Sequence, residues 1–169
     1  TPIDIVKFTS AFGYWTRQKT GNNKMIIGRD ARPSGEMVSN LVSATLQGLG
    51  INVIDLGLST TPTVEMAVMM ENAGGGIIVT ASHNPVQWNA LKLLNDQGEF
   101  ISEQNGAEVL ELVKNQNITF AENNKIGSYK KDDTYIDKHI EAILKLPLVD
   151  VEAIRAKKFS IAIDCVNST

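Results

Sequence analysis

A regular alternation of short apolar runs and amphipathic segments is the sequence feature that most constrains this fold. Residues 25–27, 51–56 and 77–79 are short, apolar and rich in β-branched side chains, as expected of buried strands. Residues 36–49 carry apolar side chains at helical spacing, and Thr61-Pro62 opens a second helix. This alternation is typical of a parallel sheet with crossover helices. The sequence therefore predicts an α/β three-layer sandwich, with helices on both faces of a largely parallel sheet.

The middle of the chain indicates that this sheet is mixed. Residues 91–94 are strand-like, the turn-forming residues 95–98 follow, and residues 99–101 can pair back as the second strand of a hairpin. The segments outside these strands are predicted to be helices at 1–21, 102–114 and 135–144 and a polar surface loop at 115–131.

The last twenty residues suggest a domain boundary. A short helix is expected at 150–157, and Phe159, Ile161 and Ile163 alternate with other residues as in the first strand of a new sheet. We therefore expect one domain over residues 1–148, followed at 149–169 by a linker and the first strand of a truncated second domain. Because the chain opens at Thr1 rather than at a methionine, it is expected to be part of a longer protein.

Composition excludes several classes of partner. The formal net charge is −3 at pH 7 and no basic cluster interrupts the sequence, which argues against nucleic acid. No apolar run approaches the roughly 18 to 20 residues that span a bilayer, so no membrane association is expected. Cys165 is the single cysteine, so no intrachain disulfide can form and a cytoplasmic location is expected.

Polar residues that could carry chemistry follow two of the predicted strands. Thr80-Ala81-Ser82-His83-Asn84-Pro85 comes directly after the strand at 77–79, and Arg29 and Arg32 follow the strand at 25–27. Open α/β sheets bind ligands at the carboxyl ends of their strands. Backbone amides of a tight polar loop and nearby arginines both bind phosphate. The pattern therefore predicts a phosphate site around Ser82.

The residue types alone leave other interpretations open. Ser82, His83 and Asn84 can simply satisfy backbone groups in a turn. The arginines can fasten loops or form surface ion pairs, and Lys92 can be a solvated strand position between two leucines. A serine hydrolase is disfavoured because Ser82 lacks the flanking glycines of a nucleophile elbow.

The spacing of these residues resembles a known family. Residues 80–85, followed by Asn89 and by Lys92 ten positions after the serine, resemble the phosphoserine loop of the α-D-phosphohexomutase superfamily. That superfamily contains phosphoglucomutases, phosphomannomutases and phosphoglucosamine mutases. Residues 28–34 resemble its Gly-x-Asp-x-Arg-x-Ser segment. The chain departs from the pattern at Ala90, where the family often has glycine, and it lacks the family's opening Phe-Gly-Thr-Ser-Gly segment.

The resemblance implies a phosphoenzyme that moves phosphate between C1 and C6 of a hexose phosphate through a hexose 1,6-bisphosphate. Ser82 would carry the phosphoryl group, Lys92 would act as general acid and base, and His83 would assist proton transfer. The residues expected to bind phosphate are Arg29, Arg32, Asn84 and Asn89.

The resemblance also implies a cofactor and a limit. Mg²⁺ would bind a phosphoryl oxygen on Ser82 together with an Asp-x-Asp-x-Asp loop from a second domain, and that loop is absent from this sequence. The fragment alone is therefore expected to be inactive. A non-catalytic sugar-phosphate-binding module is the alternative. The identity of the hexose is not predicted, because the family reads it with another domain.

Overall fold

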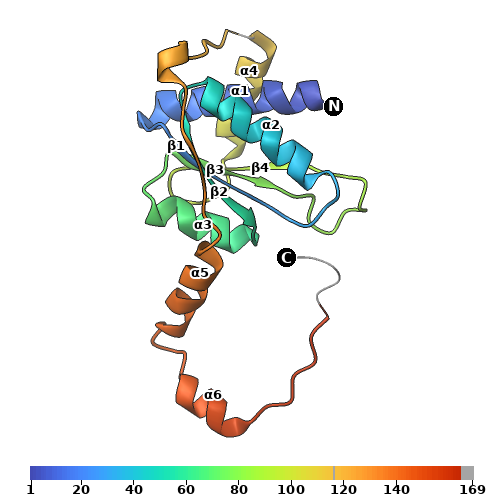
Figure 1. Ribbon diagram of the computed structural model, residues 1–169, viewed down its shortest axis with the longest axis vertical. Coiled ribbons are helices and arrows are strands. Elements are labelled where there is room, and N and C mark those ends of the chain that lie inside the picture. The colour runs from blue at the N-terminus through green and yellow to red at the C-terminus, as the bar shows by residue number, and fades with distance from the viewer. Residues whose placement is uncertain (116, 165–169) are drawn as a thin grey trace.

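A five-stranded sheet forms the middle layer of the computed structural model, which describes residues 1–115 and 117–164 (Figure 1). Its strands are β1 (Lys24–Arg29), β2 (Asn52–Leu58), β3 (Gly75–Val79), β4 (Leu91–Leu94) and β5 (Tyr129–Lys131). The strand order is β4-β3-β1-β2-β5, in which β4 runs antiparallel to β3 and the other neighbours are parallel. The prediction of a mixed, largely parallel sheet is confirmed.

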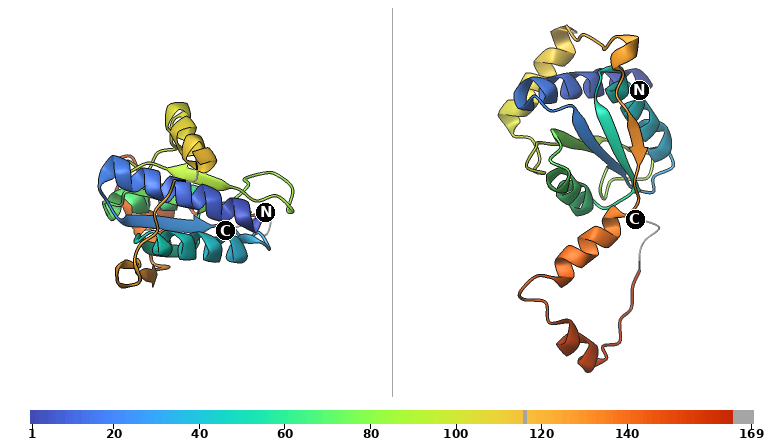
Figure 2. Two further views of the ribbon diagram at one scale, coloured as in Figure 1. Left: turned by 90° about the horizontal axis from the view of Figure 1, so that it is seen from above. Right: turned by 60° about the vertical axis from the view of Figure 1, so that its left-hand side comes forward.

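Helices cover both faces of this sheet, as predicted (Figure 2). The helices of the described residues are α1 (Pro2–Thr20), α2 (Gly35–Gly48), α3 (Thr61–Met70), α4 (Glu103–Asn115), α5 (Tyr135–Leu144) and α6 (Val151–Lys157), with a short 3-10 helix, η1, at Asn123–Lys125. Phe12 of α1, Val42 of α2 and Val109 of α4 are buried in the core on one face. Val64 of α3 and Tyr135 of α5 are buried in the core on the other. None of these helices is long and apolar enough to cross a membrane.

The ends of α1 follow directly from the sequence. Thr1 caps the helix: its side chain accepts a hydrogen bond from the Asp4 backbone N–H, and the Asp4 side chain bonds back to the N-cap. Pro2 occupies the first turn, where its missing N–H costs nothing. At the other end Gly21 adopts φ 67°, the left-handed conformation that favours glycine after a helix. The predicted limits of this helix are confirmed.

Two predictions for the middle of the chain need correction. Residues 99–101 do pair back, through an antiparallel bridge from Phe100 to Leu94 and a hydrogen bond from the Ile101 N–H to the Leu93 carbonyl, but they form no second hairpin strand, because α4 begins at Glu103. The segment 115–131 is not entirely loop, because Tyr129–Lys131 forms β5 and pairs in parallel with β2. These three residues are exposed and lack apolar alternation, so the strand depends on its neighbour in the sheet rather than on its own sequence pattern.

The predicted strand at 159–164 is also wrong. These residues have no regular secondary structure, and Phe159, Ile161 and Ile163 are 65%, 77% and 80% exposed. Alternation of apolar residues favours a strand only where a neighbouring strand satisfies its backbone, and this segment is not part of the sheet. Residues 165–169 of the same predicted segment lie outside the described part of the chain.

Two tyrosines attach the last elements to the body of the domain. The Tyr129 hydroxyl donates a hydrogen bond to Asp55 Oδ2 at 2.8 Å, which links β5 to β2. The Tyr135 hydroxyl donates to Glu71 at the end of α3. Burial, followed by the hydrogen bond and charge of Asp55, raises the pKa of Tyr129 to about 12. Burial, followed by the hydrogen bond and charge of Glu71, also raises the pKa of Tyr135.

These tyrosines predict a loss of stability at alkaline pH. An unfolded tyrosine ionises near pH ~10, whereas folded Tyr129 keeps its proton until about pH 12. In that window the unfolded chain releases a proton that the folded chain retains, so rising pH favours unfolding. Urea denaturation should give a lower free energy of unfolding at about pH 11 than at about pH 9. Tyr129→Phe should reduce this difference, and an undiminished difference would remove Tyr129 as a cause.

Candidate functional site

The candidate site lies at the carboxyl ends of two neighbouring strands, β1 and β3. The turns after β1 and β3 leave the sheet at the same edge, on the right in Figure 1. The Asp30 N–H donates to the Val79 carbonyl at 3.1 Å, which joins the two strand ends. The Thr80 N–H donates to the Ala90 carbonyl at 3.1 Å, which closes the base of the following loop. Residues 81–89 therefore form a closed loop, called here the Ser82 loop, on a rigid base.

Ser82 lies on the exposed part of this loop in an uncommon conformation. Its φ is 55°, in the left-handed region that residues other than glycine, asparagine and aspartate seldom occupy. Such a conformation persists only where the surroundings hold it, and it is frequent at functional sites. The Ser82 hydroxyl lies 3.5 Å from Nδ1 of His83, also exposed. The structure thus brings together two of the three residues predicted to be catalytic.

A chain of hydrogen bonds runs beneath Ser82. The Ser82 N–H donates to Thr80 Oγ1 at 3.1 Å, and the Thr80 hydroxyl donates to Asp30 Oδ2 at 2.6 Å. Asp30 also accepts from Arg32, from the backbone N–H at 3.1 Å and from Nε at 3.1 Å. The backbone of Ser82 is therefore connected to an ion pair at the end of β1.

Arg32 faces the Ser82 loop from beneath. Its Nη1 donates to the carbonyls of Pro85 and Trp88 at 2.7 and 2.9 Å. Its Nη2 donates to the carbonyls of Ser82 and Asn84, both at 2.8 Å. Together with the bond from Nε to Asp30, these contacts use all five N–H donors of the guanidinium. The side chain is only 10% exposed. Its assignment as a phosphate ligand stays a prediction, and these contacts do not support it.

The other three predicted phosphate ligands differ in how many hydrogen-bond donors they have left for a ligand. Asn84 Nδ2 donates to the Ala81 carbonyl at 2.9 Å, within the loop. Asn89 Nδ2 donates to Ser34 Oγ at 3.0 Å, so its amide holds the loop against the start of α2. Arg29 donates only from Nη1, to the Asp30 carbonyl at 3.2 Å, among the described residues. Arg29 therefore retains the most hydrogen-bonding capacity for an anion.

Lys92 is placed on the strand that leaves the loop. It pairs with Ile78 in the β3–β4 ladder, two residues beyond the Thr80–Ala90 base. Its ammonium lies 5.5 Å from the centre of the Phe100 ring, at cation–π distance. Among the described residues it forms no ion pair and no hydrogen bond with Ser82. The side chain is half-buried, so it is not the plain solvated position that alternation allowed.

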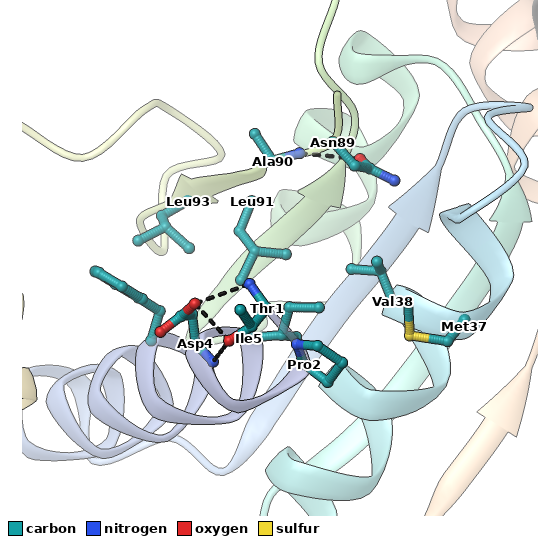
Figure 3. A pocket seen from close by; sticks show the side chains of 11 residues that line it. Thr1, Pro2, Asp4, Ile5, Met37, Val38, Asn89, Ala90, Leu91 and Leu93 are labelled. Atoms are coloured by element: carbon teal, nitrogen blue, oxygen red, sulfur yellow. Dashed lines mark hydrogen bonds and ion pairs between the residues drawn. The ribbon is translucent and has the colours of Figure 1, made fainter. Parts of the chain in front are cut away.

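A hollow of about 450 Å³ lies beside the loop, between the start of α1, α2 and β4 (Figure 3). Asn89 and Ala90 line the side that borders the loop, while Ile5, Val38 and Leu91 make the remainder largely apolar. The polar groups of Thr1 and Asp4 are bonded to each other by the helix cap. A sugar phosphate would find few donors there, so the polar face of the Ser82 loop is the better candidate site.

The described residues do not form a complete magnesium site. No group of three or more His, Cys, Asp or Glu side chains among residues 1–115 and 117–164 is placed to hold a metal ion. The carboxylate nearest to Ser82 in the hydrogen-bond chain, Asp30, already accepts from Arg32 and Thr80. Ser82 is predicted to bind the metal through a phosphoryl oxygen, and the part of the chain that the structure describes offers no cluster to complete that coordination.

Sequence reasoning missed the roles of Asp30 and Thr80. Both were visible only as parts of motifs, although an acidic residue two positions before Arg32 is well placed to accept the N–H of that residue. Thr80, two positions before Ser82, accepts its N–H in the same manner. Short spacings of this kind predict local turns, but the long-range bond between Asp30 and Thr80 needs the fold.

The chain is similar to known sugar-phosphate mutases. Residues 1–119 match the family model described as phosphoglucomutase/phosphomannomutase, alpha/beta/alpha domain I. A phosphoglucomutase/phosphomannomutase of Thermococcus kodakarensis is 36% identical over 168 residues, covering 99% of this chain and 36% of the relative. A phosphoglucosamine/phosphogalactosamine mutase of Sulfurisphaera tokodaii is 31% identical over 169 residues, covering 99% of this chain and 36% of the relative.

A solved structure shares the fold. The phosphoglucomutase/phosphomannomutase family protein of Burkholderia thailandensis superposes with a TM-score of 0.71 at 23% identity, over 85% of this chain and 32% of that one. The chain thus spans about a third of the length of the proteins it matches. Since the family model covers most of its residues, the chain belongs to the phosphoglucomutase/phosphomannomutase family, and residues 1–119 correspond to its α/β/α domain I.

Proposed function

We propose that Ser82 carries a phosphoryl group that moves between C1 and C6 of a hexose phosphate. The observation that carries the proposal is the exposed Ser82 hydroxyl, on a left-handed residue of a loop closed at the carboxyl edge of the sheet. Residues 1–148 would form the phosphoserine-bearing domain, and 149–169 would lead into the next. Because the chain spans 36% of the length of the first two relatives, the fragment alone is proposed to be inactive.

The transfer itself needs only a hydroxyl, a phosphoryl group and a proton carrier. When phosphorylated Ser82 reacts with a sugar hydroxyl, the bond between Oγ and phosphorus breaks and a bond from the sugar oxygen to phosphorus forms. The sugar hydroxyl gives up its proton, and Ser82 Oγ recovers one. The hexose 1,6-bisphosphate formed in this way can return its other phosphoryl group to Ser82 by the reverse step, which completes an isomerisation.

Three side chains are proposed to support this step. Lys92 takes the proton from the sugar hydroxyl and returns it in the reverse direction. His83, 3.5 Å from the Ser82 hydroxyl, assists proton transfer at Oγ. Arg29 binds phosphate with the donors that the described residues leave unused. A phosphoserine carries nearly two negative charges at neutral pH, so a cation close by lowers the cost of forming it.

The proposal includes a magnesium ion, most of whose ligands would come from outside this chain. When bound, it would offset charge on the phosphoryl group. The ligand that this chain supplies is a phosphoryl oxygen on Ser82, and the remaining ligands would come from a further domain. No step above is assigned to the metal.

Intact-mass analysis of the full-length protein tests the proposal. After incubation with a hexose 1,6-bisphosphate, the protein should gain the mass of one phosphoryl group, and peptide mapping should place it on Ser82. A phosphoryl group on another residue would contradict the proposal. Retention of the sugar bisphosphate without a covalent adduct would instead support a non-catalytic sugar-phosphate-binding module. The control is the same incubation with a hexose that carries no phosphate.

A further inference from the structure

We infer that Arg32 is a positioning residue that holds the Ser82 loop in the shape needed for phosphoryl transfer, and that it is not a ligand of the substrate phosphate. The inference rests on the proposed function of Ser82 as phosphoryl carrier. It concerns the inner side of the loop, which faces away from the solvent and toward the end of β1.

Arg32 distributes its donors over both halves of the loop. One guanidinium binds carbonyl oxygens of Ser82 and Asn84 on the first half of the loop and of Pro85 and Trp88 on the second half. The four distances lie between 2.7 and 2.9 Å, which is good hydrogen-bond geometry for a charged donor. The loop is thereby held closed around a single side chain.

Electrostatics also favours a guanidinium at this position. Four carbonyl oxygens that converge on one point carry partial negative charge and repel each other when nothing lies between them. A planar guanidinium offers five donors in a rigid fork, whereas an ammonium offers three on a flexible stem. A lysine at this position would keep the charge but could not satisfy all four carbonyls and Asp30. Arg32 is therefore not replaceable by another cation.

Ser82 is held from both of its peptide groups. Its N–H is connected to Asp30 through Thr80, and its carbonyl accepts directly from Arg32. Asp30 and Arg32 are themselves paired at 3.1 Å. The two peptide groups that flank Ser82 are thus both hydrogen-bonded, directly or through Thr80, to the Asp30–Arg32 ion pair. Without it, Ser82 would relax toward the more favourable conformations with negative φ and its hydroxyl would change direction.

Arg32 has no unused guanidinium donor with which to bind a phosphate. Every N–H of the Arg32 guanidinium already has a protein acceptor, so a substrate phosphate could bind it only by displacing a loop carbonyl. Arg29, with unused donors among the described residues, requires no such displacement. Arg29 at the end of β1 and Arg32 in the turn after it therefore have different roles: Arg32 shapes the loop, and Arg29 is free to bind the anion.

The test uses Arg32→Lys in the full-length protein, with hydrogen exchange as a readout that does not depend on activity. The hydrogen-bonded backbone amides of the loop and its base, those of Thr80, Ser82, Asn84, Trp88 and Ala90, should exchange at least about tenfold faster than in the unsubstituted protein, because the loop opens more often. Arg17→Lys is the matched control. Arg17 also donates to a backbone carbonyl, that of Leu49, but this contact lies near the amino end of β2, away from the Ser82 loop. That control should leave exchange in the loop unchanged.

Kinetics then distinguish positioning from binding. Arg32→Lys should lower kcat by roughly tenfold to a hundredfold, as expected for a misplaced reacting group, while KM for the hexose phosphate should change little. In Arg32→Ala, added guanidinium ion should restore part of the lost rate and part of the lost protection, whereas methylammonium should restore neither.

Two results would overturn the inference. Loop exchange that is the same in Arg32→Lys and in the unsubstituted protein would show that Arg32 does not hold the loop. A raised KM with an unchanged kcat would make Arg32 a substrate ligand. If Ser82 of the unsubstituted protein takes up no phosphoryl group, the proposed function fails by itself, and the exchange experiment still decides whether Arg32 holds the loop.

Discussion

Substitution of Ser82 by glycine or by alanine is expected to abolish phosphohexomutase activity of the full-length protein while leaving the fold intact. The phosphoryl group would have no oxygen to attach to, and removal of a covalent nucleophile typically costs on the order of 10⁴-fold or more in kcat. Glycine is the sharper change, because φ 55° at this position suits glycine and the loop keeps its conformation without strain. Turnover of hexose phosphate and thermal unfolding are the two measurements.

A matched control for this experiment is Ser128→Ala. Ser128 donates to Asn52 at the amino ends of β2 and β5, the edge of the sheet opposite to Ser82. Its removal should leave turnover unchanged. If Ser82→Gly and Ser82→Ala retain near-normal turnover, Ser82 is not the phosphoryl carrier. If both proteins unfold at a much lower temperature than the unsubstituted protein, the loss of activity says nothing about the chemistry of the hydroxyl.

The second large effect is expected from Lys92→Met. General acid–base assistance is worth roughly a hundredfold to ten-thousandfold in rate, so kcat should fall by that factor with little change in KM. Methionine keeps the length and the apolar stem, and its sulfur can still pack on the Phe100 ring. The change therefore removes the amine and its cation–π contact while keeping an apolar side chain of similar size beside the ring. Steady-state kinetics of the full-length protein give both parameters.

Lys114→Met provides the comparison for Lys92→Met. Lys114 is exposed on α4 and pairs, among the described residues, with Glu111, so its loss should have no measurable effect on turnover. A rise in KM at constant kcat in Lys92→Met would assign Lys92 to phosphate binding instead of proton transfer. An unchanged rate would remove it from the site altogether.

Sequence reasoning predicted the central fold well because that part is specified by local pattern. The strands β1, β2 and β3 and the helices between them have either continuous apolar runs or clear helical spacing, and their limits were close to those observed. It failed at the edges of the sheet. β5 has three exposed residues and exists because β2 offers a free edge, whereas Phe159 to Asp164 has the alternation of a strand but does not join the sheet.

The site shows the same division between local and long-range information. Ser82 and His83 were found because they are adjacent in sequence, and the structure places them 3.5 Å apart. The function of Arg32 could not be found in this way. Its four loop carbonyls lie 50 to 56 residues away in sequence, and backbone carbonyls carry no signal in the residue types around them. A sequence can show that an arginine is present, but not which backbone oxygens it binds.

The position of Arg32 outside the Ser82 loop has a consequence for how such a site can be moved or redesigned. The backbone hydrogen bond between Thr80 and Ala90 closes the loop, so that the loop resembles an independent structural unit. Its shape, however, is set by a side chain from the turn after β1. A graft of residues 80–90 onto the hairpin of another protein would transplant the serine without its geometry. The smallest portable unit is the pair of adjacent strand ends with both of their turns.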